Sequence, residues 1–272
     1  MTTSKPQIPA EVVDSVSKRW PELASAWLDS APDELAQICQ RYEGRYVRTF
    51  HARYGFVVEV ETARGPLVLK STPDPQGIDQ AEVSRSLSRI GVGPHIYEIF
   101  QTPVSVWTVA SRVLPGDPLN GKAVSLHRLA SVFRKMRDQK SENDRLPSLA
   151  AWLRSRLDDE NLSDLAPGRS QAPHSERRQA TAILEDLGSG VSGMVCHGDA
   201  SSRNILLGPD EQLMLIDPRG VNGDVCYDVA VAAWKTASDD SPQGRAEQLA
   251  RLVGVDTERV KAWLVVANTA RV

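Results

Sequence analysis

The stretch from His197 to Gly220 constrains the fold and chemistry of this chain more than any other segment. It reads His-Gly-Asp-Ala-Ser-Ser-Arg-Asn-Ile-Leu-Leu-Gly-Pro-Asp-Glu-Gln-Leu-Met-Leu-Ile-Asp-Pro-Arg-Gly. Two apolar runs flank a Gly-Pro-Asp turn signal, which predicts a β-hairpin over residues 204–217. Because both ends of a hairpin return to one place, we expect Asp199, Asn204 and Asp217 to converge.

Three such side chains suit phosphoryl transfer. One carboxylate, Asp199, orients the attacking hydroxyl and accepts its proton, while Asn204 and Asp217 supply oxygen ligands for Mg²⁺ on nucleotide phosphates. The alternative is an Asx-rich turn between a strand and a hairpin. A simple turn does not require a second aspartate at the far end of the hairpin, so the pattern favours catalysis. His197 is expected to anchor this loop rather than to transfer protons.

Composition indicates a soluble globular protein. The chain has 272 residues, of which 41% are hydrophobic and 25% charged, and its net charge of −3 gives no electrostatic reason to bind nucleic acid or an anionic membrane. Three scattered cysteines without metal-ligand spacing indicate reduced thiols. No signal-peptide pattern or long apolar run is present, which predicts a cytoplasmic protein without a membrane partner. The sequence leaves monomer and dimer open.

The periodicity of the remaining chain predicts an α+β protein with two lobes. We expect helices over 11–43, interrupted at Pro21 and Pro32, to form an N-terminal segment over 1–44. An N-lobe over 45–113 is predicted to contain strands at 46–50, 56–61, 66–70, 95–101 and 104–113, with a helix at 79–90. After a hinge at 114–118, the C-lobe (114–272) is predicted to be mainly helical, at 125–138, 148–159, 175–188, 227–236, 243–253 and 256–270, with a loop over 160–174.

Lys70 ends the apolar run that begins at Pro66, where a lysine can bind nucleotide phosphates. Glu82, in the following helix, is the natural partner for it, and Asp79 is the alternative. A single lysine at a strand end is more often simply exposed. The order along the chain supports the functional interpretation, because strand lysine, helix glutamate, hinge and then Asp…Asn…Asp is the order of a kinase fold. The turn over residues 52–55 holds one glycine and is only a weak phosphate-binding signal.

The charges around the hairpin carry less information. Eight acidic and three basic side chains lie within 197–240, which favours a basic substrate only slightly, since metal ligands, turns and helix ends account for most of the acids. Asp228 has two interpretations: it caps the helix that it opens, or it braces the loop of Asp199.

The motif His-Gly-Asp-x-x-x-x-Asn, followed by Ile-Asp-Pro, resembles the signature of the aminoglycoside phosphotransferase-like kinases, which share the bilobal fold of protein kinases. The run over 215–230 and the segment over 8–28 resemble in particular the streptomycin 6-phosphotransferase and hydroxyurea phosphotransferase branch. That branch usually has Gly-Asp-Pro or Gly-Glu-Pro where this chain has Gly223-Asp224-Val225.

This resemblance implies a small-molecule kinase that uses ATP, or GTP, with Mg²⁺. The implied acceptor is a hydroxylated small molecule, most simply an aminoglycoside antibiotic such as streptomycin that phosphorylation inactivates. Other antibiotics (nucleoside or peptide), hydroxyurea, a sugar or an amino alcohol remain open as acceptors, and so does a catalytically inactive binding module. The implied roles are catalytic base (Asp199), Mg²⁺ ligands (Asn204, Asp217), phosphate-binding lysine with its partner (Lys70, Glu82) and adenine contacts in the 109–113 connector (Ala110, Ser111).

Overall fold

The chain divides into two compact units in a computed structural model that describes residues 6–162, 164–165, 168–188 and 193–272. One unit comprises Met1–Ala81 and Pro94–Arg112, and the other comprises Glu82–Gly93 and Val113–Val272. The helix α3 (Gly77–Ile90) contributes residues to both. None of the described helices combines the length and apolarity needed to cross a bilayer. The lobe boundaries expected from the sequence stay a prediction.

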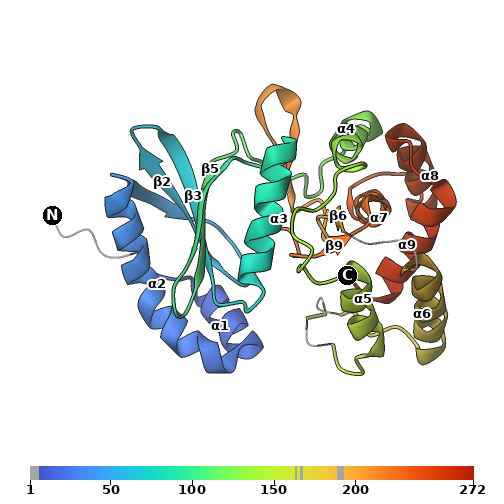
Figure 1. Ribbon diagram of the computed structural model, residues 1–272, viewed down its shortest axis with the longest axis horizontal. Helices are drawn as coiled ribbons and strands as arrows, with labels where there is room; N and C mark the ends of the chain where they lie inside the picture. The colour runs from blue at the N-terminus through green and yellow to red at the C-terminus, as the bar shows by residue number, and fades with distance from the viewer. Residues whose placement is uncertain (1–5, 163, 166–167, 189–192) are drawn as a thin grey trace. The chain divides into compact units, whose positions relative to one another are not determined.

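The first unit is built on an antiparallel sheet with the strand order β1-β2-β3-β5-β4 in its described residues (Figure 1). In the sheet register, Lys70 lies between Val57 on one neighbouring strand and Thr108 on the other. The elements of this unit, besides the start of α3, are α1 (Ala10–Arg19), α2 (Pro21–Arg41), β1 (Arg45–Thr49), β2 (Phe56–Thr62), β3 (Gly65–Thr72), β4 (Ile96–Gln101) and β5 (Val106–Ser111).

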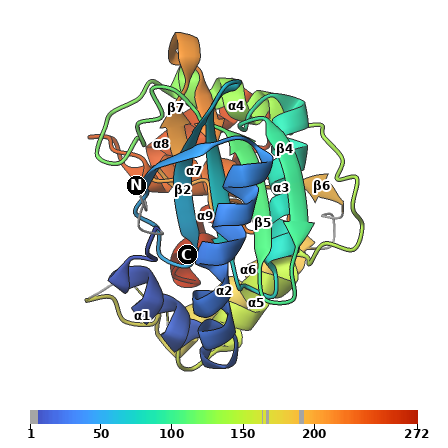
Figure 2. The same cartoon turned by 90° about the vertical axis from the view of Figure 1, so that its left-hand side faces the viewer.

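Helices α1 and α2 cover one face of this sheet, as Figure 2 shows from the helix side. Alternating residues of β2, such as Phe56 and Val58, are fully buried against them. Trp27 of α2 is also fully buried, and its indole N–H donates to Ser71 Oγ on β3 at 2.9 Å. Burial of these large side chains supplies the free energy that holds the helix pair on the sheet.

The predicted interruption at Pro32 is wrong, because α2 continues through this residue. A proline inside a helix removes one hydrogen bond and costs about 3 kcal/mol or more. The apolar stripe that includes Trp27, Ala31 and Leu35 is buried on both sides of the proline. Burial of a large apolar side chain such as Leu35 recovers roughly 1.5–3 kcal/mol, which explains why tertiary packing overrides the local break.

The second unit is mainly helical, as predicted. Its described elements, besides the end of α3, are α4 (Leu126–Met136), α5 (Leu149–Asp158), α6 (His174–Gly188), β6 (Met194–Val195), β7 (Ile205–Leu207), a 3₁₀ turn (Pro209–Glu211), β8 (Leu213–Leu215), β9 (Asn222–Gly223), α7 (Val225–Lys235), α8 (Pro242–Val253) and α9 (Thr257–Thr269). Strands β7 and β8 form the expected hairpin, and Ile205 pairs with Leu215. Apart from His174, which begins α6, no helix or strand occupies the described part of the predicted loop 160–174, of which residues 163, 166 and 167 lie outside the description.

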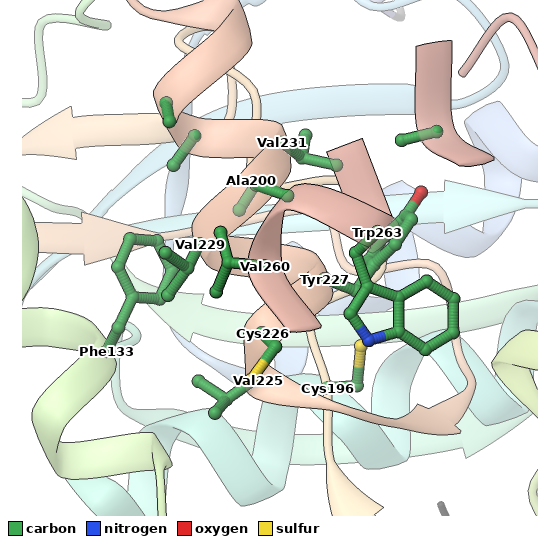
Figure 3. Packing of buried hydrophobic residues seen from close by; sticks show 14 of the residues in the cluster. Phe133, Cys196, Ala200, Val225, Cys226, Tyr227, Val229, Val231, Val260 and Trp263 are labelled. Carbon is green, nitrogen blue, oxygen red and sulfur yellow. The ribbon is translucent and has the colours of Figure 1, made fainter. Parts of the chain in front are cut away.

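Helix α7 is the centre of the second unit's core. Its residues from Val225 to Ala233 are all buried, which is the pattern of a helix surrounded by protein on every side (Figure 3). Tyr227 packs edge-to-face on Trp263 of α9, with ring centroids 5.6 Å apart. Asp224 caps the helix by accepting from Cys226 N at 2.9 Å, and it also accepts from the Trp263 indole N–H at 2.7 Å. The start of α7 and α9 are therefore fixed to each other.

Candidate active site

A buried carboxylate holds the backbone of the loop that carries Asp199. Asp228 of α7 accepts hydrogen bonds from the backbone N–H groups of His197 at 2.7 Å and Gly198 at 2.9 Å. Burial raises the pKa of Asp228 to about 7, against the lowering effect of the two N–H donors. Of the two interpretations of Asp228, bracing of the loop is confirmed, because Asp224 provides the helix cap.

His197 ties the same loop to the far end of the hairpin. Its Nε2 lies 2.8 Å from the carbonyl oxygen of Ile216, and its Nδ1 accepts from Asp199 N at 3.2 Å. A carbonyl only accepts, so Nε2 carries the proton and the ring is neutral. Burial lowers the pKa of His197 from its usual 6.5, which preserves this neutral form. The ring is completely buried and anchors the loop, as expected.

Gly198 is required by both conformation and space. Its φ of +78° lies in the left-handed region. A Cβ at this position would lie 2.6 Å from Cβ of Arg219 and 3.0 Å from a methyl carbon of Val221. Arg219 is held there because its N–H donates to the carbonyl of His197 at 2.8 Å. The tight turn before Asp199 therefore depends on the absence of a side chain.

The hairpin brings its polar ends together. Asn204 Nδ2 donates to Asp199, reaching the carbonyl oxygen at 3.0 Å and Oδ2 at 3.1 Å. The N–H of Ile216 donates to the carbonyl of Asn204 at 2.9 Å, which places Asp217 one residue beyond that bond. Asp217 has a φ of +59°, which is uncommon for a residue with a side chain. The roles predicted for these three residues stay predictions, but their backbone convergence is the one the sequence predicted.

One carboxylate oxygen of Asp199 is available to accept a further hydrogen bond. Its Oδ1 is buried and has no hydrogen-bond partner among the described residues. A buried acceptor without a donor costs about 1–3 kcal/mol, so native proteins retain one only for a reason. A hydroxyl group that donates to Oδ1 would satisfy this atom.

The polar ends of the hairpin also fit a magnesium ion. Among the described residues, no group of three or more His, Cys, Asp or Glu side chains is placed to hold a metal. Mg²⁺ does not need such a cage, because it binds through one or two protein oxygens together with phosphates and water. The Asn204 amide nitrogen donates to Asp199, so its amide oxygen is left available, and the metal-ligand roles of Asn204 and Asp217 stay predictions.

Lys70 lies near the end of β3, beneath the turn over residues 52–55. A Cβ on Gly55 would lie 3.7 Å from Lys70 Cε and 2.9 Å from the carbonyl oxygen of Ser71. The hydroxyl of Thr72 donates to the carbonyl of Tyr54 at 3.1 Å, which holds the turn against the strand. The single glycine of this turn is therefore needed for close approach to the backbone of β3 at Ser71.

Glu82 and Ser111 each have contacts within their own unit. Glu82 forms an ion pair with Arg85 at 2.8 Å, and its pairing with Lys70 of the other unit stays a prediction. The N–H of Ser111 donates to the carbonyl of His95 at 2.8 Å, and its Oγ accepts from His95 N at 3.0 Å. Ser111 thus holds the start of β4, and a nucleotide contact by Ala110 or Ser111 is untested.

A family profile decides the classification. The profile of the APH phosphotransferase enzyme family matches residues 47–263, which is most of the chain. The chain belongs to this phosphotransferase family. A search of curated proteins finds none that matches.

Solved structures show that this phosphotransferase has the predicted fold. It resembles an aminoglycoside-3'-phosphotransferase of type VIII with a TM-score of 0.58, 19% identity, and 87% of this chain and 98% of that chain covered. It resembles a choline/ethanolamine kinase family protein from Mesorhizobium loti with a TM-score of 0.65, 18% identity, and coverage of 89% and 83%. For the spectinomycin phosphotransferase APH(9)-Ia, solved with ADP and spectinomycin, the TM-score is 0.59, the identity 10%, and the coverage 88% and 85%. The α+β, protein-kinase-like fold class is confirmed.

Proposed function

We propose that this phosphotransferase transfers the γ-phosphoryl group of ATP, or of GTP, to a hydroxyl group of a small molecule. The observation that carries the proposal is the contact between Asn204 and Asp199 at the base of the hairpin, with Asp199 Oδ1 left without a donor. The spectinomycin enzyme solved with ADP supports the choice of an adenine nucleotide.

In this proposal the residues of the chain mainly position the reactants and neutralise the charge of the phosphates. Asp199 accepts a hydrogen bond from the attacking hydroxyl and then its proton, while the buried Asp228 and His197 fix the loop that carries it. Asn204 and Asp217 would hold Mg²⁺, and Lys70 would contact the phosphates. When bound, magnesium and the nucleotide supply charge neutralisation and the transferred phosphoryl group.

Two acceptor classes follow from the resemblances. The motif likeness to streptomycin 6-phosphotransferases, together with the aminoglycoside phosphotransferase among the solved structures, supports streptomycin or a related antibiotic. With such an acceptor the enzyme would inactivate the drug in the cytoplasm, where ATP is available. The choline/ethanolamine kinase family protein supports an amino alcohol as the second class.

An ADP-release assay tests this function directly. The purified chain is incubated with Mg²⁺ and ATP, or GTP, and with aminoglycosides, spectinomycin, choline, ethanolamine, hydroxyurea and nucleoside and peptide antibiotics, one at a time. We expect acceptor-dependent ADP release that disappears on chelation of the metal. Nucleotide binding in calorimetry without ADP release for any acceptor, whether cationic, neutral or anionic, would contradict the proposal and indicate an inactive binding module.

A further inference from the structure

The backbone and Cβ of Arg219 contact the loop that carries Asp199. Its N–H donates to the carbonyl of His197 at 2.8 Å, and its Cβ lies against Gly198, the residue before Asp199. Its guanidinium carbon lies 4.5 Å from the ring centroid of Trp152 on α5, a cation–π contact that holds the side chain in place. Its Nε is buried and has no hydrogen-bond partner among the described residues.

A second indole holds two more cations in the same unit. Lys235 Nζ, at the end of α7, lies 5.2 Å from the ring centroid of Trp234, and the guanidinium carbon of Arg169 lies 5.4 Å from it. Burial lowers the pKa of Lys235; the Asp199 carboxylate raises it, and Arg169, Arg219 and Arg156 lower it further. These cations and the proposed catalytic carboxylate therefore share one electrostatic environment.

Three of the four cations of this cluster form no ion pair among the described residues. Arg156 is compensated, because it makes two bonds to the Asp164 carboxylate, at 2.7 and 3.1 Å. Across the described ranges, in contrast, no carboxylate forms an ion pair with Arg169, Arg219 or Lys235. Partly buried cations are normally paired, and within the described chain Arg219 and Lys235 are not, which indicates a site for an anion; Arg169 lies exposed beside them on Trp234.

Tyr227 provides an independent sign of a ligand. Its side chain is completely buried, yet its hydroxyl has no hydrogen-bond partner among the described residues. Burial raises the pKa of this hydroxyl, and the nearby charges of Asp199 (raising) and Arg219 (lowering) also act on it. A buried tyrosine hydroxyl normally finds a partner. The Tyr227 hydroxyl is therefore an unused buried polar group on which the charges of both Asp199 and Arg219 act.

We propose that the acceptor of this enzyme carries an anionic group, a carboxylate or a phosphate, in addition to its hydroxyl, and that Arg219, Lys235 and Arg169 bind that group. The inference rests on the proposed function and refines its substrate class. It departs from the cationic acceptors that the resemblances support, because a cation would lie against side chains of the same sign. The count of acids over 197–240 overstates the negative charge available to a substrate, since Asp224 and Asp228 are bonded within the core.

Matched acceptors separate charge from shape. ADP release is measured with glycerol against glycerate, ribose against ribose 5-phosphate, and with choline and streptomycin as cations. We expect the highest kcat/KM for an anionic member, above its neutral counterpart by about tenfold or more, because a charge-assisted hydrogen bond contributes about 1.5–3 kcal/mol. Lys235→Gln and Arg219→Gln should raise the KM of that acceptor by a similar factor and leave the KM of ATP nearly unchanged.

Two further variants distinguish loss of acceptor binding from loss of folding. Arg219→Lys keeps a charge and a long stem, and it should retain part of the acceptor affinity. Arg251→Gln removes the same charge from an exposed ion pair with Glu247 on α8 and should behave as wild type.

Three results would overturn the inference. The first is turnover of streptomycin, choline or a neutral compound without turnover of any anionic one, which would leave the phosphotransferase function intact. The second is an anionic acceptor whose KM is unchanged in both Gln variants. The third is absence of release with every class despite ATP binding, which would refute the proposed function itself.

Discussion

Replacement of Asp228 tests whether a buried brace positions the catalytic loop. Asp228→Ala leaves two buried N–H donors, those of His197 and Gly198, without an acceptor. At about 1–3 kcal/mol for each orphaned group, the free energy of unfolding should fall by about 2–6 kcal/mol. Asp228→Asn keeps one carbonyl acceptor and should lose roughly half of that. At about 2–4 °C per kcal/mol for a protein of this size class, the two variants are separable by Tm.

Urea unfolding monitored by tryptophan fluorescence measures the change, and kcat for ADP release is determined on the same preparations. Asp14→Asn is the matched control, because its carboxylate makes only an exposed ion pair with Lys18. We expect kcat to fall in both Asp228 variants at temperatures where they are folded, since the loop of Asp199 loses its fixed position. Unfolding free energies within about 0.5 kcal/mol of wild type for both variants would refute the reasoning.

Three further predictions concern the same site. His197→Gln should flatten the pH dependence of stability. Because burial lowers the pKa of His197 below 6.5, the contribution of the neutral imidazole to stability is complete above that pH and is lost as the pH falls. Wild type should therefore lose more unfolding free energy than the variant between about pH 7.5 and 5.5, and equal slopes would contradict this. Gly198→Ala should lower the free energy of unfolding by about 1–2 kcal/mol because of its left-handed backbone, and by more because of the contact with Arg219. Gly91→Ala, at a φ of +73° with open space around it, should show the backbone cost alone in the same urea titration. Asp217→Asn should raise the Mg²⁺ concentration needed for half-maximal ADP release, and an unchanged metal titration would remove Asp217 from the metal site.

The hairpin and its convergence could be predicted because their signals are local. Two apolar runs around a Gly-Pro-Asp turn specify the pairing of Ile205 with Leu215 without reference to distant parts of the chain. The path of α2 through Pro32 could not be predicted, since it depends on burial of its stripe against a sheet formed later in the sequence. The two-residue strands β6 and β9 are too short to show any periodicity.

The cation cluster shows a different limit of sequence reasoning. Trp152, Arg169, Arg219 and Lys235 come from four separate segments, and each is unremarkable where it stands. Only the fold brings them into one electrostatic environment. Counting acids over 197–240 pointed weakly to a basic substrate, because a count does not distinguish a buried Asp228 bonded to backbone N–H groups from an exposed charge. The arginine directly after the Asp-Pro of the motif was the one available signal.

The most direct test of the account is the kinetic behaviour of Asp199→Asn. The substitution keeps the shape of the side chain and its ability to accept from Asn204, and it removes the capacity to take the hydroxyl proton. We predict a fall in kcat of about 10²–10⁴-fold, as expected for loss of a general base, with the Kd of ATP in calorimetry essentially unchanged. Turnover close to wild type would contradict the central claim that Asp199 is the catalytic residue of this phosphotransferase.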